Sequence, residues 1–245
     1  MDSINKDGFI TSDKVYKKLT QKGDPFPIAY GSRRVINGIV VHQTATETAG
    51  QVFNSYIGNH ANGAHFLIDL NGKIYQTASL YKIARHVGEI RARCLLRSTC
   101  SKVEIDAGLE EWNKKPDIKK SHNHEKMKAF PDRFPKNEDS IGIELVGMAW
   151  KSDPQRKKRL EDQSAKEKNW DHYIFDPLTK EQLASLEWLI RYLSEKFKVP
   201  FSEVYRHPEI SFKKSREAIS AKELIEKLKA EEVEVKAKEE AEAKQ

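Results

Sequence analysis

The chain has 245 residues, 38% of them hydrophobic and 33% charged, which suits one sizeable domain with additions or at most two small domains. It contains no apolar run of the roughly 18 residues that span a bilayer, and residues 1–7 begin no ordinary secretory signal, because no basic region precedes an apolar one. The formal charge of +6 favours anionic partners such as nucleic acid, a membrane surface or a cell-wall polymer. Since no nucleic-acid motif and no basic stripe with interleaved aromatic residues is present, we expect no nucleic-acid partner.

The first strong element is a strand that ends in a histidine. Residues 1–34 are expected to form a mobile or loosely packed lead-in, with a short helix over Lys14–Gln21. In the next stretch, Ile36–His42, two β-branched residues stand directly before His42. This pattern is typical of a buried strand that delivers an imidazole at its carboxyl end. A lone histidine is more often a core residue than a ligand, so its meaning depends on partners elsewhere in the chain.

A helix and a hairpin are expected next. The helix spans Ala49–Asn59, and three side chains at helical spacing predict its inward face: Phe53, Tyr56 and Ile57. The hairpin joins Ala64–Asp69 to Lys73–Thr77 through Asn71-Gly72. An Asn-Gly pair between two β-rich runs is the strongest short signal for a hairpin.

Residues 91–137 are polar and irregular, and we interpret them as a long insertion with one short helix near Gly108–Lys114. The segment Ser121-His122-Asn123-His124-Glu125 suggests a metal site at first sight. We favour a polar loop there, because two imidazoles in a mobile loop lack ordered supporting groups. Cys94 and Cys100 are too few for a four-cysteine zinc site, and they either close a small disulfide loop or remain free thiols.

A second strong strand is predicted over Ser140–Gly147, followed by a charged loop over residues 151–172. Thr179 and Gln182 then form a capping box that starts the best amphipathic helix of the chain. Its apolar face should cover the sheet and consists of Leu183, Leu186, Leu189, Ile190, Leu193 and Phe197.

The C-terminal part contains a second short apolar stretch that ends in a histidine, Val204–Pro208 with His207. A second capping box, Ser220 to Glu223, should start a helix with Leu224, Ile225 and Leu228 on its inward face. From residue 230 to 245 the sequence becomes a mixture of Glu, Lys and Ala. We expect that tail to be an exposed extension of the helix or disordered.

Three residues far apart in the sequence form a candidate metal site. His42 and His207 each follow a hydrophobic run, and Glu217 lies ten residues after His207. Two imidazoles and one carboxylate are a complete set of protein ligands for a catalytic zinc ion, with one position left open. Sets of this kind also arise by chance, so the spacing alone does not establish the site.

Four motifs make a resemblance specific, because they occur in the order found in one family. They are Val40-Val41-His42-Gln43-Thr44-Ala45, the hairpin Ala64–Gln76, Asn137–Glu144, and Arg206-His207-Pro208-Glu209-Ile210-Ser211. Together they resemble the zinc-dependent N-acetylmuramoyl-L-alanine amidases, which include phage lysozyme-like amidases, bacterial muropeptide amidases and peptidoglycan recognition proteins. The resemblance covers roughly residues 35–228, so we expect an amidase domain over 35–229, with the insertion at about 91–137 and a charged tail over 230–245.

The resemblance implies an α/β (α+β) fold, in which helices flank a mixed central β-sheet and a zinc cleft lies on one face. It implies hydrolysis of the amide between N-acetylmuramic acid and the L-alanine of the stem peptide. His42 and His207 match the two histidine ligands of the family. The third ligand is usually Asp or Cys, and here Glu217 stands at the matching spacing.

Further roles follow from the same resemblance. Glu144 matches the catalytic glutamate, which can take a proton from water and pass it to the leaving amine. The family has an oxyanion-stabilising lysine shortly before the third ligand, and Lys213 is favoured over Lys214 for this role. His65 is expected near the cleft as a supporting residue or a substrate contact. His86 stands where relatives often carry a tryptophan-containing turn, and we expect it to be a structural or cleft-lining residue, with a substrate contact as a further role.

Two alternatives remain open. The same fold also serves muropeptide recognition without cleavage, although the retained ligands His42 and His207 favour an enzyme. The expected substrate lies outside the cytoplasm, in the periplasm or beyond, which requires export without a visible signal. A phage lysin, a delivered toxin and a cytoplasmic recycling enzyme are the candidates. The long insertion and the pair Cys94 and Cys100 favour a delivered antibacterial effector with an inhibitory immunity partner.

Overall fold

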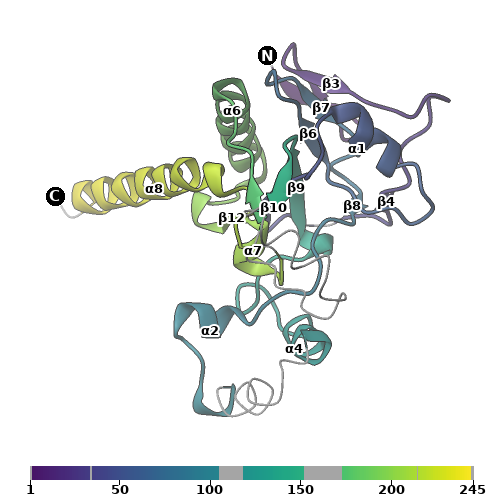
Figure 1. The fold of residues 1–245 in the computed structure, drawn as a ribbon. Helices are drawn as coiled ribbons and strands as arrows, with labels where there is room; N and C mark the ends of the chain where they lie inside the picture. The colour runs from purple at the N-terminus through teal and green to yellow at the C-terminus, as the bar shows by residue number, and fades with distance from the viewer. Residues whose placement is uncertain (1, 34, 105–117, 152–172, 214, 244–245) are drawn as a thin grey trace.

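A computed structural model describes residues 2–33, 35–104, 118–151, 173–213 and 215–243. Its centre is a mixed six-stranded sheet with the order β12-β5-β9-β6-β7-β3 (Figure 1). The strands are β3 (Val15–Lys17), β5 (Gly38–Gln43), β6 (Phe66–Ile68), β7 (Ile74–Gln76), β9 (Ser140–Leu145) and β12 (Val204–Arg206). The expected fold, a mixed central sheet flanked by helices, is confirmed.

The middle of the sheet is parallel and fully covered. β5 pairs in parallel with both β12 and β9, and β9 pairs in parallel with β6. Strands in such a position are buried on both faces and are therefore rich in Val and Ile, as Val40 and Val41 illustrate. The register places His42 directly beside Glu144 on the neighbouring strand, so these two side chains leave the sheet on the same face.

One face of the sheet is covered by two helices, α6 (Lys180–Phe197) and α8 (Lys222–Glu242) (Figure 1). Thr179 and Gln182 form the predicted capping box at the start of α6. The predicted apolar face of α6 packs on alternate residues of β5 and β9 in one core cluster, with Ile39, Val41, Ile141, Ile143 and Leu145 facing Leu186, Leu189, Ile190 and Leu193. Because side chains alternate along a strand, His42 and Glu144 face the other way.

The opposite face carries α1 (Ala49–Ser55) and the short helix α7 (His207–Ile210). Thr48 caps α1 through a capping box with Gln51. The inward face predicted for this helix is only partly right. Tyr56 is 2% exposed, but Ile57 is 54% exposed, because the helix ends at Ser55 and the chain turns away before Ile57 is reached.

The N-terminal residues pack more closely than expected. The helix predicted over Lys14–Gln21 is wrong: β3 forms there and pairs in parallel with β7 at the edge of the main sheet. Val15 and Tyr16 supply too few apolar positions for a helical face, whereas the open edge of β7 offers hydrogen-bonding groups to a short strand. Five apolar side chains of this segment are buried, Phe9, Ile10, Val15, Phe26 and Ile28, so the described lead-in is not loosely packed.

The hairpin of β6 and β7 forms as predicted, with Phe66 opposite Gln76. Three small two-stranded sheets decorate the main one. Their strands are β1 (Ser3–Ile4), β2 (Ile10–Thr11), β4 (Ala29–Tyr30), β8 (Ile83–Ala84), β10 (Ala149–Lys151) and β11 (Tyr173–Phe175). The helix expected near Gly108–Lys114 and nearly all of the loop expected over 151–172 lie outside the described residues.

The insertion is anchored to the strand that leads to His207. Its described helices are α2 (Arg93–Arg97) and α4 (Ile118–Glu125). The guanidinium of Arg93 donates to both carboxylate oxygens of Glu203, which lies in the 3-10 turn η3 (Phe201–Glu203) just before β12. Arg93 is 4% and Glu203 7% exposed. Removing one partner of such a buried ion pair strongly destabilises the folded protein, because the other charge is left buried without a partner.

Two interpretations of the insertion are resolved by these residues. Cys94 and Cys100 form a disulfide, which decides between the two alternatives left open. The loop expected around His122 and His124 is wrong, because both lie in α4. Nδ1 of His122 accepts a hydrogen bond of 3.1 Å from the backbone of Ile90, so that histidine ties α4 to the main body.

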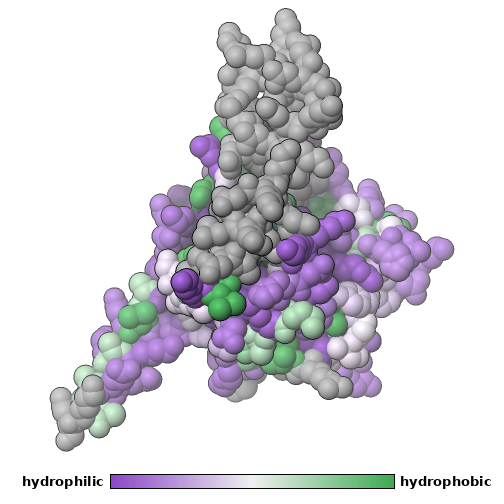
Figure 2. All heavy atoms as spheres, turned by 90° about the horizontal axis from the view of Figure 1, so that it is seen from below, coloured by the Kyte–Doolittle hydropathy of each residue, from purple (hydrophilic) through white to green (hydrophobic). Residues whose placement is uncertain are grey.

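The C-terminal helix continues through the expected tail to Glu242 and projects from the body of the molecule (Figure 2). The capping box predicted at Ser220 is wrong. Ser220 lies inside a 3-10 turn, η4 (Ile219–Ala221), that directly precedes α8. The N-cap of α8 is therefore Ala221, which makes no side-chain capping hydrogen bond. None of the helices in the described ranges combines the length and apolar character that crossing a membrane requires.

The division into lead-in, domain and tail stays a prediction.

Candidate metal and catalytic site

The three predicted metal ligands come together on the face of the sheet opposite α6. His42 lies near the end of β5, His207 is the first residue of α7, and Glu217 lies in the loop before η4. Their ligand atoms all lie within 4.8 Å of one another, and all three side chains are buried. Arg206 supports this arrangement, because its guanidinium donates to the backbone oxygens of Ser215 and Glu217 at 3.4 Å. The strand that delivers His207 therefore also holds the loop that delivers Glu217.

The two distances from Glu217 to the histidine nitrogens fit a tetrahedral metal. Oε1 of Glu217 lies 3.1 Å from Nδ1 of His207 and 3.5 Å from Nδ1 of His42. Zinc bonds of about 2.0–2.1 Å at tetrahedral angles place neighbouring ligand atoms roughly 3.3 Å apart. Two imidazoles and one carboxylate are also a donor set that zinc accepts. The residues present therefore fit a zinc ion.

The electrostatics of the cluster keep His42 and Glu217 in the forms that bind a cation. Burial, together with the nearby His207, lowers the pKa of His42 to about 4, so this imidazole is neutral at pH 7. Burial alone would raise the pKa of Glu217, but the close contacts of its carboxylate with His207 and His42 outweigh it and hold that pKa well below its ordinary value. A neutral imidazole beside an ionised carboxylate is the state that a divalent metal requires.

Glu144 lies beside the cluster and is held by Tyr56, a residue that the sequence did not indicate. The hydroxyl of Tyr56 donates to Oε2 of Glu144 and accepts from the backbone N–H of Ala64 at 3.3 Å. The sequence predicts Tyr56 on the apolar face of its helix, and its spacing with Phe53 gives no sign of a polar role. The only available signal was that a buried tyrosine hydroxyl needs a partner.

Burial raises the pKa of Glu144 to about 7, with a further contribution from the negative charge of Glu217, although the hydrogen bond from Tyr56 opposes the rise. A carboxyl group with this pKa exchanges its proton near neutral pH, which suits a general acid or base.

The same shift predicts a pH dependence of stability in the metal-free protein. Because the pKa of Glu144 is higher in the folded than in the unfolded chain, unfolding releases a proton between about pH 4.5 and 7. The free energy of unfolding of the wild type should therefore fall relative to Glu144→Gln as the pH rises through this range, by on the order of 3 kcal/mol. Urea denaturation of both proteins in a chelator at several pH values measures this difference. Parallel curves would contradict it.

His86 and His65 extend the site along the sheet as buried rings. Nδ1 of His86 lies 3.1 Å from Nε2 of His42, and the rings of His65 and His86 are 5.7 Å apart. His65 has no exposed surface, and its Nδ1 accepts from the backbone of Gly142 at 3.1 Å. Of the two roles expected for His65, this burial favours support over substrate contact. His86 is 9% exposed, so its burial likewise favours the structural role, and the substrate contacts of both rings stay predictions.

Lys213 lies at the edge of the cluster. Its positive charge contributes to the lowered pKa of His42, and a methyl group added at Gly88 would lie 3.6 Å from its Nζ. Within the described residues no carboxylate forms an ion pair with Lys213, so the ammonium remains available. Lys214, the alternative, lies outside the described residues.

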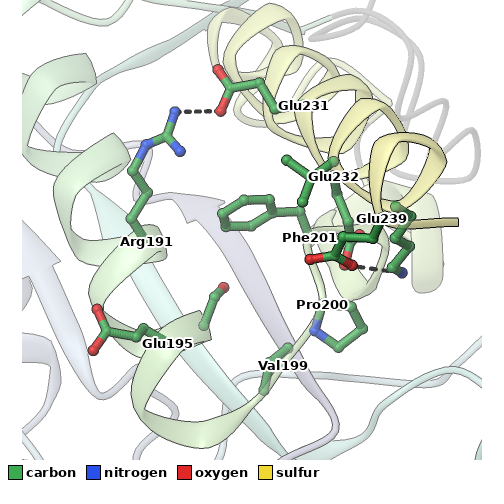
Figure 3. Close-up of a pocket in the computed structure, with 11 residues that line it drawn as sticks. Arg191, Glu195, Val199, Pro200, Phe201, Glu231, Glu232 and Glu239 are labelled. Atoms are coloured by element: carbon green, nitrogen blue, oxygen red, sulfur yellow. Dashed lines mark hydrogen bonds and ion pairs between the residues drawn. The ribbon is translucent and has the colours of Figure 1, made fainter. Parts of the chain in front are cut away.

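A separate groove of about 410 Å³ lies between α6 and α8, away from this site (Figure 3). It is lined by charged and apolar side chains, and Arg191 and Glu231 form an ion pair of 2.7 Å across it. The lining contains no histidine or cysteine. It therefore offers no chemistry comparable to that of the histidine–glutamate cluster.

Comparison with known proteins identifies a family. Residues 32–219 match the family model described as N-acetylmuramoyl-L-alanine amidase. This match covers more than half of the chain and includes every residue of the cluster. No curated protein sequence matches the chain.

Several solved structures are similar to this chain at low sequence identity. The amidase LysC from Clostridium intestinale URNW is 16% identical, with a TM-score of 0.42 over 81% of this chain and 85% of that chain. A mutant endolysin from Bacillus subtilis is 16% identical, with a TM-score of 0.45 over 88% and 96% of the two chains. AmpDh3 from Pseudomonas aeruginosa, solved with an anhydromuramic pentapeptide, is 20% identical, with a TM-score of 0.43 over 80% and 55%.

Proposed function

This chain belongs to the N-acetylmuramoyl-L-alanine amidase family, and we propose that it is a zinc-dependent peptidoglycan hydrolase. The bond cleaved is the amide between the lactyl group of N-acetylmuramic acid and the L-alanine of the stem peptide. The observation that carries this proposal is the buried cluster of His42, His207 and Glu217 with Glu144 in register beside it.

The proposed roles follow from the chemistry of each group. His42, His207 and Glu217 would hold the ion. Bound there, zinc would polarise the scissile carbonyl and lower the pKa of a water at the open position. Glu144, whose pKa is about 7, takes the proton of the attacking water and delivers it to the nitrogen of the leaving L-alanine. The new C–O bond forms first and leaves negative charge on the carbonyl oxygen. The C–N bond then breaks as its nitrogen receives the proton, so the products are a carboxylate and a free amine.

Two further side chains support this transfer. The Tyr56 hydroxyl has its lone pair engaged by Ala64 and its proton directed at Glu144, so it orients the carboxylate toward the reacting atoms. We assign to Lys213 the role of stabilising the negative charge that develops on the carbonyl oxygen. An ammonium that has no carboxylate partner among the described residues is suited to that role. His86 packs against His42, and His65 packs against His86, so both buried rings support the site.

The identity of the products tests the proposal directly. Purified protein incubated with intact sacculi should release stem peptides with a free L-alanine amino group and leave unsubstituted N-acetylmuramic acid, as mass spectrometry can identify. A chelator should stop the release, and added zinc should restore it. The same assay with soluble anhydro-muropeptides separates wall lysis from recycling.

The alternative is a module that recognises muropeptides without cleaving them. Calorimetric binding of a muropeptide, combined with the absence of free stem peptide after long incubation with zinc, would favour this alternative. Retention of the complete ligand set and of Glu144 argues for the enzyme.

The disulfide between Cys94 and Cys100 supports action outside the reducing cytoplasm, where the wall lies. On this basis we propose a delivered, wall-degrading antibacterial effector, whose producing cell would need an inhibitory partner protein. If both cysteines are reduced in the working compartment, a cytoplasmic recycling enzyme becomes the better interpretation.

A further inference from the structure

The ring of His86 packs against Gly142 of β9 and beside His42 of β5. A Cβ atom added to Gly142 of β9 would lie 2.6 Å from Cγ of His86, so only glycine leaves room for this ring. The backbone N–H groups of His86 and Val87 both donate to Oδ1 of Asn137, at 3.0 and 2.7 Å. Backbone and ring are thus both held, with the ring at 83° to that of His42.

The hydrogen bonds around His86 determine which ring nitrogen carries the hydrogen. Nε2 of His86 lies 3.3 Å from the backbone oxygen of Ser140 and 3.2 Å from its hydroxyl oxygen. The hydroxyl hydrogen of Ser140 is already donated to the backbone oxygen of Lys136 at 2.6 Å. Both neighbours of Nε2 are therefore acceptors, and Nε2 must carry the hydrogen.

The tautomer of His86 also determines the tautomer of His42. With its hydrogen on Nε2, a neutral His86 presents a lone pair at Nδ1, which lies 3.1 Å from Nε2 of His42. That lone pair accepts a hydrogen from Nε2 of His42, and the lone pair of His42 is then left on Nδ1. Nδ1 is the atom of His42 that faces Glu217 at 3.5 Å.

We propose that His86 is a positioning residue that selects the metal-binding tautomer of His42. Ligating histidines commonly donate their second N–H to a carboxylate or a carbonyl, and such partners orient the ring and set its tautomer. Here a second imidazole, itself set by Ser140, does this. The inference rests on the proposed zinc site, and it gives the structural role expected for His86 a specific form, the support of a ligand.

Two replacements of His86 separate the acceptor from the volume of the ring. Asparagine places its side-chain oxygen near the position of Nδ1 and can still accept from His42, whereas leucine cannot. We expect His86→Leu to weaken zinc binding by about 10–100-fold and His86→Asn to recover most of that loss, as measured by competition with a chromogenic chelator. His124→Leu, on the exposed side of α4, is the control and should bind zinc like the wild type.

Gly142→Ala tests the same contact without altering either histidine. The added methyl group should displace the His86 ring and weaken zinc binding in the same direction as His86→Leu. The wild type provides a measurement that needs no variant. In the zinc-loaded protein labelled with ¹⁵N-histidine, Nε2 of His86 should carry the hydrogen, and a coupling through the hydrogen bond should connect Nε2 of His42 with Nδ1 of His86.

The outcomes distinguish this inference from the proposed function. Zinc affinity of His86→Leu equal to that of the wild type, equal losses in the Leu and Asn variants, or a hydrogen on Nδ1 of His86 would each overturn the inference. If the zinc results are as expected but sacculi are not digested, the proposed function fails while the inference stands. If sacculi are digested and His86 does not influence zinc, the reverse holds.

Discussion

Replacement of Glu144 by glutamine is expected to reduce amide hydrolysis by about 10²–10⁴-fold without changing the zinc content of the purified protein. Glutamine has nearly the same shape and can still accept a hydrogen bond from Tyr56, so the site should keep its geometry. It cannot take a proton from water or deliver one to the leaving amine. Release of stem peptides from sacculi, followed by mass spectrometry, measures the loss.

The control for this experiment is Glu138→Gln. Glu138 lies in the 3-10 turn η1 (Asn137–Asp139) that precedes β9, and its side chain is 50% exposed. It should keep wild-type activity. A Glu144→Gln enzyme that retains more than about a tenth of the activity would remove Glu144 from the proton transfer, since general catalysis contributes at least about a hundredfold.

Tyr56→Phe should change the pH dependence of the same proton transfer without removing the carboxyl group of Glu144. Loss of the hydroxyl removes the donor that opposes the raised pKa of Glu144, so the carboxyl group should hold its proton to higher pH. The activity of this variant should therefore rise with pH at a higher midpoint than that of the wild type. This shift would show that Tyr56 acts through Glu144.

The parts of this fold that the sequence predicts are those determined by local pattern. The β-branched run before His42 is long enough to indicate a buried strand, and Thr179 with Gln182 marks the start of α6. Both signals depend on residues a few positions apart. The family motifs then predict roles for His42, Glu144 and His207, and the structure brings these residues together.

The features that the sequence does not predict are those that depend on contacts between residues far apart in the chain. Val15 and Tyr16 have no strong pattern of their own, and β3 exists because the edge of β7 is open to it. Tyr56 looks like a core residue until the fold places Glu144 at its hydroxyl. The role of His86 depends on the space above Gly142, which no spacing rule reveals. Site residues that act through neighbours are thus harder to predict than ligands.

The second large effect is expected at Glu217, the position where this chain departs from the Asp or Cys usual in the family it resembles. Glu217→Ala leaves only two imidazoles for the metal. We expect zinc affinity to fall by more than the 10–100-fold typical of supporting residues, and sacculus digestion to fall to background. Chelator competition and mass spectrometry of released peptides measure the two losses. Glu226→Ala, on the exposed side of α8, is the control and should change neither.

Glu217→Asp tests whether the longer side chain is matched to this loop. Aspartate is shorter by one methylene, which withdraws the carboxylate by about 1.5 Å. Oε1 of Glu217 now lies 3.1 Å from His207 and 3.5 Å from His42, and the loop is tied in place by Arg206. The backbone therefore cannot follow freely, and we expect zinc affinity between those of the wild type and Glu217→Ala. An aspartate variant that binds zinc as tightly as the wild type would mean that the loop moves to compensate, and that Arg206 does not fix its position.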